Sequence, residues 1–262
     1  MPRLYETSLS DDAWEVIEPL FLPSSSVGRP RKYVIRAIVD AIFYVVKNGC
    51  IWRCLPNDFP PWKTVYYYFR LWSNSGLWKL LNTTLVAVAR LCAGKKESPS
   101  LVSIDSQSQS AEPGVYERGL DGGKKVNGRK RTIAVDTLGL LLICFCTPGN
   151  RADKDAGERI AKALNDDKRF PRLKKILGDS AYQNVGHDFD IGVSIEAAER
   201  RKGQKGFVPQ AFRWAVERTF AWLNRQRRLV RNYEKKTLHQ ESMNYIGNIR
   251  LCIKRYEKWL FA

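Results

Sequence analysis

The spacing of apolar residues changes once along this chain, near residue 100, and the change separates two kinds of structure. Before it, apolar side chains recur every three or four residues, which is the period of an amphipathic helix. From Leu101 onward, short runs alternate between apolar and polar residues, as strands with one buried face do. The sequence therefore predicts a helical region followed by a mixed α/β region.

The helical region predicts several short helices. Ser10 is a candidate N-cap, and a second helix is expected from about residue 33 to 48, before a glycine stop. A third carries the apolar residues of 65–72, and a fourth begins near Leu77. Short helices with tight turns and basic residues are typical of helix-turn-helix modules, so we expect residues 1–92 to form a DNA-binding domain. A helical packing or dimerisation domain is the alternative.

Residues 93–100 are polar and rich in structure-breaking residues, so we expect a linker there and a second domain over residues 101–262. Its strands are expected at residues 101–105, 131–136, 140–146, 175–177 and 192–196, and its helices at 153–165 and about 209–231. A ribonuclease H-like α/β domain requires this order. The predicted fold class is α+β, with an N-terminal helix-turn-helix-like domain followed by a ribonuclease H-like catalytic domain with basic C-terminal helices.

The net charge of +17 indicates a polyanionic partner. The charge is uneven: residues 1–100 carry +5, residues 101–199 are neutral, and residues 200–262 carry +12. A neutral middle between basic ends suggests a core where carboxylates collect, between surfaces that bind phosphate. A protein that is merely basic is the alternative.

Cysteine and histidine usage argues against a zinc site. The six cysteines form no CxxC pair, and there are only two histidines. We expect reduced thiols in a cytoplasmic protein. The first residues do not resemble a signal peptide, and no apolar stretch reaches the roughly 20 residues of a membrane span, so no membrane is expected as a partner.

Three carboxylates occupy positions that suit a metal site. Asp105 ends one apolar run and Asp179 follows another, and strand ends are where α/β sheets place their chemistry. Glu217 borders a buried helical stripe, within roughly 60° of Arg213 and Asn224. Taken singly, the aspartates could be turn residues or N-caps, and the glutamate a helical ion pair. As a set they could hold two Mg²⁺ ions, with Mn²⁺ as a substitute, because hard cations take oxygen ligands.

Basic residues near these carboxylates are candidates for contacts with phosphate. One group precedes the central strand, and the other lies on or after the helix that carries Glu217. The predicted DNA-binding residues are Lys124, Lys125, Arg129, Lys130, Arg131, Arg213, Arg218, Arg225, Arg228 and Arg231. A solvated loop is the alternative for the first group. Trp214 and Trp222 are expected to pack in the core rather than stack on a base.

Several runs carry a family resemblance, among them Trp52–Pro56, Gly178–Tyr182 and Arg213–Asn224. With others they cover almost the full length, and they resemble bacterial insertion-sequence transposases of the DDE class, in the insertion sequence five group. The resemblance implies that Asp105, Asp179 and Glu217 are the catalytic triad. It also implies double-stranded DNA as the partner, both terminal inverted repeats and target, with a homodimer or larger assembly on DNA at the bacterial nucleoid.

The resemblance implies hydrolysis of a phosphodiester bond at the element end, followed by transfer of the freed 3′-OH into target DNA. Two departures stand out. Residues 180–184 lack the two glycines that often flank the tyrosine, and Asn224 stands where related transposases have a lysine or arginine, with Arg225 or Arg228 as the candidate substitute. The alternatives are a catalytically silent, domesticated transposase or DNA-binding regulator, and a nuclease that cuts without joining.

Overall fold

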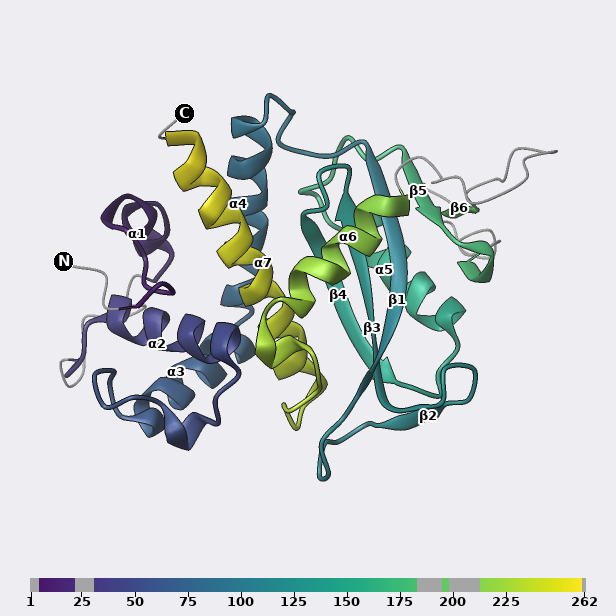
Figure 1. The fold of residues 1–262 in the computed structure, drawn as a ribbon. Helices are drawn as coiled ribbons and strands as arrows, with labels where there is room; N and C mark the ends of the chain where they lie inside the picture. The colour runs from purple at the N-terminus through teal and green to yellow at the C-terminus, as the bar shows by residue number, and fades with distance from the viewer. Residues whose placement is uncertain (1–4, 22–30, 183–194, 198–212, 261–262) are drawn as a thin grey trace.

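The N-terminal region folds into helices, as its apolar spacing predicts (Figure 1). The structure is a computed structural model that describes residues 5–21, 31–182, 195–197 and 213–260. The helices and 3-10 turns of this region are α1 (Asp11–Ile17), η1 (Glu18–Phe21), α2 (Ile35–Asn48), η2 (Trp52–Cys54), α3 (Trp62–Asn74) and α4 (Leu77–Cys92).

The expected start and stop signals act as predicted. Ser10 Oγ accepts a hydrogen bond from the Ala13 N–H at 3.2 Å and so caps α1. Gly49 ends α2 with a φ of 72°, a left-handed conformation that glycine adopts without strain. Ser10 therefore fixes the start of α1 through its side chain, and Gly49 fixes the end of α2 through its backbone conformation.

Among the described residues, six strands form one sheet. They are β1 (Leu101–Ser110), β2 (Gly119–Asp121), β3 (Val126–Asp136), β4 (Leu141–Pro148), β5 (Lys175–Gly178) and β6 (Ile195–Ala197). The pairing order is β2-β3-β1-β5-β6, and β4 also pairs with β3. β3 pairs antiparallel with β1, β2 and β4. β5 pairs parallel with β1 and with β6.

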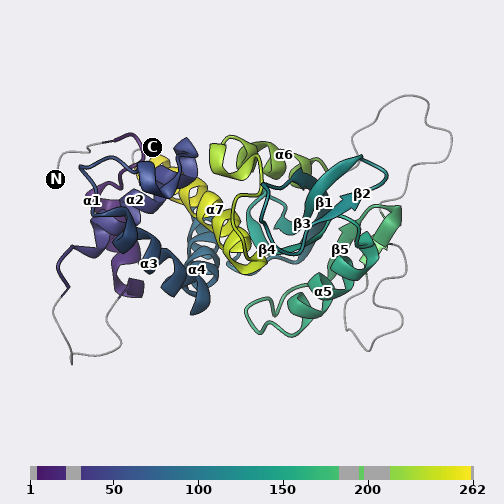
Figure 2. The ribbon, with the colours of Figure 1, turned by 90° about the horizontal axis from the view of Figure 1, so that it is seen from below.

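Helices α5 (Asp153–Asn165) and α6 (Arg213–Asn224) cover opposite faces of this sheet (Figure 2). Alternation along β1 decides which side chains meet which helix. Gln107 and its partner Arg131 face α6, whereas Ser106 and its partner Thr132 face α5.

Helix α7 (Thr237–Leu260) lies between the sheet and the N-terminal helices (Figure 1). Its side chains cover the outer edge of β4, where Tyr245 Oη accepts the Cys144 N–H at 3.0 Å and Glu241 Oε1 accepts the Cys146 N–H at 2.8 Å. An uncovered edge strand would offer these donors to another chain. Because α7 also packs against α4, the helical region and the sheet share one hydrophobic core.

Four elements differ from the prediction. β1 continues to Ser110, and β3 begins at Val126 after the short β2, which was not predicted. The helix expected at 209–231 ends at Asn224 and is followed by the turn η4 (Arg227–Leu229), while 209–212 and 192–194 lie outside the described residues. The chain turns there because Arg228 and Leu229 are buried, which a straight continuation of α6 would not allow. In the described ranges, no helix combines the length and apolar character that crossing a membrane requires.

Candidate active site

The strand pairing places Asp105 and Asp179 at adjacent positions. β1 and β5 pair in parallel, with Ser103 opposite Leu177. Asp105 and Asp179 each lie two residues further along, and neighbouring strands are about 4.8 Å apart. The two aspartates therefore stand on neighbouring segments of the sheet, one within β1 and the other directly after β5.

Local hydrogen bonds orient both carboxylates. The Ser106 N–H donates to Asp105 Oδ1 at 2.7 Å, and the Ala181 N–H donates to Asp179 Oδ1 at 2.9 Å. The second bond belongs to the turn η3 (Ser180–Tyr182), which follows Asp179 directly. Aspartate favours such turns because its short side chain reaches a nearby backbone N–H.

Glu217 lies on α6, the helix that covers the Asp105 face of the sheet. At its C-terminal end, Asn224 Oδ1 accepts a hydrogen bond from Arg131 of β3 at 2.7 Å. One turn earlier, Thr219 Oγ1 donates to the Gly139 carbonyl just beyond β3 at 2.7 Å. α6 therefore runs alongside β1 in the same direction, and Glu217 lies toward the N-terminal part of β1. Its side chain is exposed.

The structure does not gather the three carboxylates into one group. Among the described residues, no three His, Cys, Asp or Glu side chains lie close enough together to hold a metal ion. The register brings Asp105 and Asp179 to adjacent positions, and Glu217 stands on the helix above that face. A single closed pocket of three carboxylates stays a prediction.

The Tyr182 side chain is close enough to Asp105 and Asp179 to be affected by their negative charges. Burial raises the pKa of its phenol well above the usual range; the hydrogen bond with Ser106 lowers this pKa, while the charges of Asp153, Asp105 and Asp179 raise it further. The negative potential of these carboxylates therefore converges near one buried hydroxyl.

Four of the predicted DNA-binding residues are buried, and for these four the prediction is wrong. Arg129 donates to the Glu234 carbonyl at 2.9 Å, and Arg228 pairs with the Glu234 carboxylate at 2.7 Å. Lys130 pairs with an aspartate of α5 at 3.1 Å. Burial lowers the pKa of Arg131 to about 10, so it stays charged at neutral pH while only 1% of it is exposed. Side chains held in this way cannot reach a phosphate.

The other predicted residues are more accessible. Lys124 and Lys125 are exposed in the turn between β2 and β3, and Arg225 is exposed just after α6. Arg231 is half-buried and donates to a backbone carbonyl at 3.2 Å. The side chain of Arg213 lies outside the described residues. Because Arg228 is buried, Arg225 is the better of the two candidates to stand in for the basic residue that Asn224 replaces.

Arg218 is stacked between two tryptophans of α6. Its guanidinium carbon lies 3.9 Å from the ring centroid of Trp214 and 4.5 Å from that of Trp222, and it donates to the Leu138 carbonyl at 2.9 Å. Trp214 is 45% exposed, so the expectation that it packs in the core is wrong. Cation–π contact with Arg218 supports its indole instead.

Accessible basic side chains also occur in the helical region and in the segment after α6, and of those named here the sequence analysis predicted only Arg225. We name this group the basic strip; its members are Lys47, Arg53, Lys63, Arg225 and Arg227. Lys47 Nζ donates to the Arg225 carbonyl at 3.4 Å, and Arg53 and Lys63 lie 5.4 and 6.0 Å from the Trp62 ring centroid. For Lys63 the sequence signal was the absence of Asp and Glu from residue 59 to 96, and this signal does not extend to the other four members.

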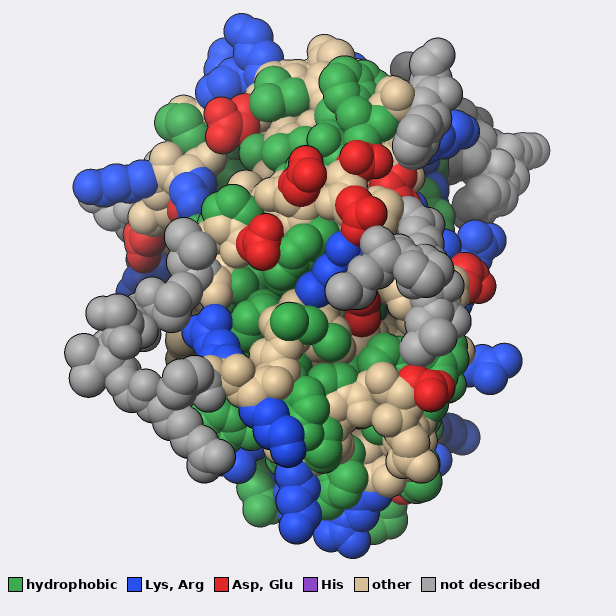
Figure 3. Space-filling view, turned by 90° about the vertical axis from the view of Figure 1, so that its left-hand side faces the viewer, with side chains coloured by type: hydrophobic (Ala, Val, Ile, Leu, Met, Phe, Trp, Pro, Cys, Tyr) green, Lys and Arg blue, Asp and Glu red, His purple; other side chains and the backbone are tan. Residues whose placement is uncertain are grey.

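Acidic side chains are unevenly placed on the outer face of the helical region. Figure 3 shows Asp and Glu side chains mostly in the upper half of that face, whereas Lys and Arg side chains occur in both halves.

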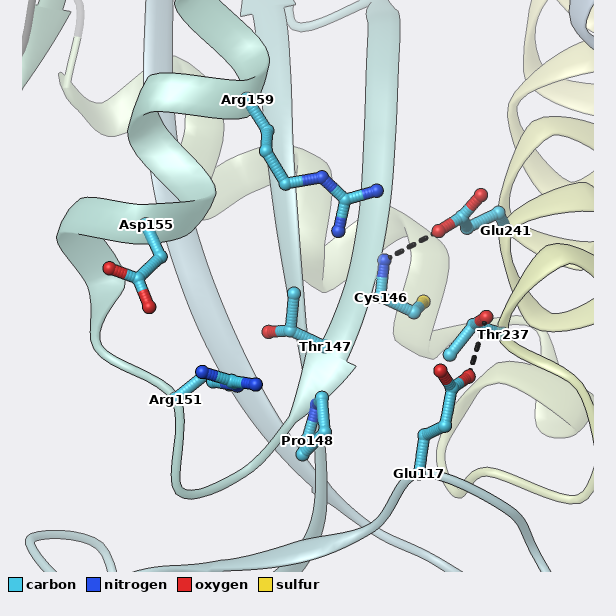
Figure 4. A pocket seen from close by; sticks show the side chains of 9 residues that line it. All are labelled: Glu117, Cys146, Thr147, Pro148, Arg151, Asp155, Arg159, Thr237 and Glu241. Carbon is cyan, nitrogen blue, oxygen red and sulfur yellow. Dashed lines mark hydrogen bonds between the residues drawn. The ribbon is translucent and has the colours of Figure 1, made fainter.

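A separate pocket of about 410 Å³ opens at the far end of β4 (Figure 4). Its lining mixes both charges, with Arg151 and Arg159 on one side and Glu117 and Glu241 on the other. The pocket extends to the end of β4 that pairs with the start of β3, whereas Asp105 pairs further along β3. It is therefore distinct from the site around the aspartates.

Three family models match successive parts of the chain. One, described as "Putative transposase of IS4/5 family", matches residues 9–82, and two described as "Transposase DDE domain" match residues 96–189 and 188–254. The chain is also 31% identical over 106 residues to the "Insertion element IS402 uncharacterized 16.2 kDa protein" of Burkholderia cepacia, an alignment that covers 38% of this chain and 71% of that protein. The chain belongs to the insertion-element transposases.

This membership confirms the resemblance drawn from the sequence. The matched families are transposases, which are enzymes of the nuclease and transferase class and bind DNA. No solved structure matches the chain. DDE domains generally use divalent metal ions. The side chains fit such ions by type, because Asp105 and Asp179 offer hard oxygen donors from adjacent positions in a field of negative charge.

Proposed function

We propose that this transposase is metal-dependent, with Asp105, Asp179 and Glu217 as its catalytic residues and as ligands of two Mg²⁺ ions that Mn²⁺ can replace. The observation that supports the proposal is the parallel pairing of β1 and β5, in which each aspartate lies two residues beyond the Ser103–Leu177 pair. α6 covers the same face and carries the third carboxylate.

Two consecutive steps would occur at this site. Water would first hydrolyse a phosphodiester bond at an element end and free its 3′-OH. That 3′-OH would then attack a phosphodiester of target DNA and displace the 3′ oxygen of the target strand. Bound divalent ions supply activation of the attacking oxygen and charge stabilisation of the leaving 3′ oxygen. Asp105 and Asp179 would bind and orient the ions, held by the N–H groups of Ser106 and Ala181. Glu217 would complete the ligand set from α6. No side chain needs to attack the DNA.

The sheet supports assignment to the ribonuclease H-like class. An antiparallel half, β4-β3-β1, continues into a parallel half, β1-β5-β6, with helices on both faces. This is the hairpin-bearing sheet that the order of elements predicted.

DNA contacts are assigned to the accessible basic residues rather than the buried ones. The basic strip joins the helical region to the end of α6, and Lys124 and Lys125 lie near β1, where Lys124 Nζ donates to the Ser106 carbonyl at 3.4 Å. The partner is double-stranded DNA, terminal inverted repeats and target, at the bacterial nucleoid. Pairing two element ends calls for at least two copies of the chain.

A second candidate is a catalytically silent DNA-binding regulator. One observation favours it: within the part of the chain that the structure describes, no three potential ligands are grouped closely enough for a metal ion. DNA binding would then depend on the basic strip and on Lys124 and Lys125, without any catalytic step.

A cleavage assay on duplexes that carry the element end separates these functions. With Mg²⁺ we expect nicked and joined products from the wild type, and bound but uncut DNA from Asp105→Asn. Asp166→Asn, which alters an exposed carboxylate at the end of α5, is the matched control and should cut normally. Cutting by Asp105→Asn would disprove the triad. Shifted complexes without nicks from the wild type would identify a regulator, and cutting without joining a nuclease.

A further inference from the structure

Tyr182 carries a buried hydroxyl that the proposed reaction does not use. This hydroxyl shares a 2.6 Å hydrogen bond with Ser106 Oγ, which shares a 2.7 Å bond with Thr132 Oγ1. All three side chains are buried. Buried polar groups require such partners, so this chain of Tyr182, Ser106 and Thr132, here named the hydroxyl chain, is a fixed part of the fold.

The Tyr182–Ser106 bond connects the two segments that hold the aspartates. Ser106 donates its N–H to Asp105 Oδ1 at 2.7 Å. Tyr182 donates its own N–H to the Asp179 carbonyl at 3.1 Å, and the preceding Ala181 N–H holds Asp179 Oδ1. A displacement of Tyr182 relative to Ser106 would therefore change the separation of the two carboxylates.

Two glycines fix the position of the Tyr182 ring. A Cβ on Gly157 of α5 would lie 2.5 Å from Tyr182 Cδ1, and a Cβ on Gly178 of β5 would lie 3.0 Å from Tyr182 Cβ. Both distances are at or below the limit for packed carbon atoms, so the ring sits in a space that exists only because both residues lack a side chain. The ring cannot move toward either element, and its hydroxyl is aimed at Ser106.

We propose that Tyr182 is a positioning residue of the metal site, which sets the spacing between Asp105 and Asp179 through Ser106. The inference rests on the proposed function. The hydroxyl chain lies on the α5 face of the sheet, whereas Asp105 lies on the α6 face, so Tyr182 touches neither metal nor DNA. Loss of hydrogen bonds that support metal ligands lowers metal affinity by roughly 10–100-fold. Because Tyr182 acts through the backbone, we expect the lower end of that range.

The test is Mn²⁺ affinity, measured by electron paramagnetic resonance titration of the full chain. Tyr182→Phe removes one hydroxyl, keeps the ring, and leaves Ser106 bonded to Thr132. We expect its Mn²⁺ affinity to fall roughly tenfold. Ser106→Ala should cause a similar fall and the double variant little more, because both break the same link. The matched control is Tyr245→Phe, which removes another buried tyrosine hydroxyl at β4 and should leave the affinity unchanged.

Cleavage kinetics separate positioning from general loss of structure. Tyr182→Phe should need roughly tenfold more Mg²⁺ for half-maximal cleavage, and saturating Mg²⁺ should restore most of the rate. If Asp105→Asn clearly loses Mn²⁺ affinity while Tyr182→Phe and Ser106→Ala both keep it, the role of Tyr182 is overturned but the proposed metal site is not. Unchanged affinity in Asp105→Asn as well would overturn the proposed metal site and the inference with it.

Discussion

Replacing Arg228 tests whether this arginine, which follows α6, stabilises the fold rather than binding DNA. Its guanidinium bonds the Glu234 carboxylate at 2.7 and 3.1 Å and lies 4.7 Å from the Tyr233 ring centroid, and both members of the ion pair are buried. Removing one partner leaves the other charge buried without compensation, which costs about 3–5 kcal/mol. Arg228→Met keeps much of the side-chain volume, so we expect the free energy of unfolding in urea to fall by about that amount.

Salt-dependent DNA binding gives the second readout. Folded Arg228→Met should keep the wild-type slope of log affinity against log salt, because Arg228 makes no phosphate contact. Arg227→Met, which alters the exposed neighbour, is the matched control: its stability should change by less than about 0.5 kcal/mol, and its slope should fall by about 0.9. Arg228→Met with Glu234→Leu should recover most of the stability. A reduced slope with unchanged unfolding free energy in Arg228→Met would refute the reasoning.

Burial raises the pKa of the Glu241 carboxyl, so the folded protein holds the carboxyl proton to higher pH than the unfolded chain does. The free energy of unfolding therefore falls as the pH rises from the ordinary carboxyl pKa through the raised one. Glu241→Gln keeps the acceptor and should melt above the wild type at pH 8 but not at pH 4; equal melting at pH 8 would contradict this. Gly49→Ala places a Cβ 2.9 Å from a neighbouring side chain at positive φ and should cost more stability than Gly76→Ala, which meets open space and should cost about 1 kcal/mol; chemical denaturation compares the two. Arg53→Ala with Lys63→Ala should weaken binding to all duplexes and reduce its salt dependence, and unchanged filter binding would remove both residues from the DNA surface.

Local patterns predicted the elements whose signals lie within a few residues. α5 has the expected bounds, Asp153–Asn165, and the hairpin turn at 137–139 forms where Gly139 adopts a φ of 75°. The longer β1 was not predicted, because its second half is polar. Gln107, for example, is stabilised by Arg131 across the sheet at 2.6 Å, a bond that only pairing creates.

The candidate site was predictable in part for the same reason. Asp179 directly follows β5, as predicted, whereas Asp105 lies within β1 rather than at its end, and the parallel pairing of β1 and β5 places both segments side by side. The burial of Arg129 and Arg131 was not predictable, since their acceptors lie about a hundred residues away in sequence, as with the Glu234 carbonyl. A run of basic residues has the same composition whether it contacts DNA or fills a core. The position of Glu217 depends on how α6 docks, which no local signal determines.

Anomalous diffraction from crystals soaked in Mn²⁺ tests the central claim most directly. The proposed function predicts two peaks about 4 Å apart, bonded to carboxylate oxygens of Asp105, Asp179 and Glu217. Clear peaks elsewhere in the crystal, with none between these three side chains, would contradict it.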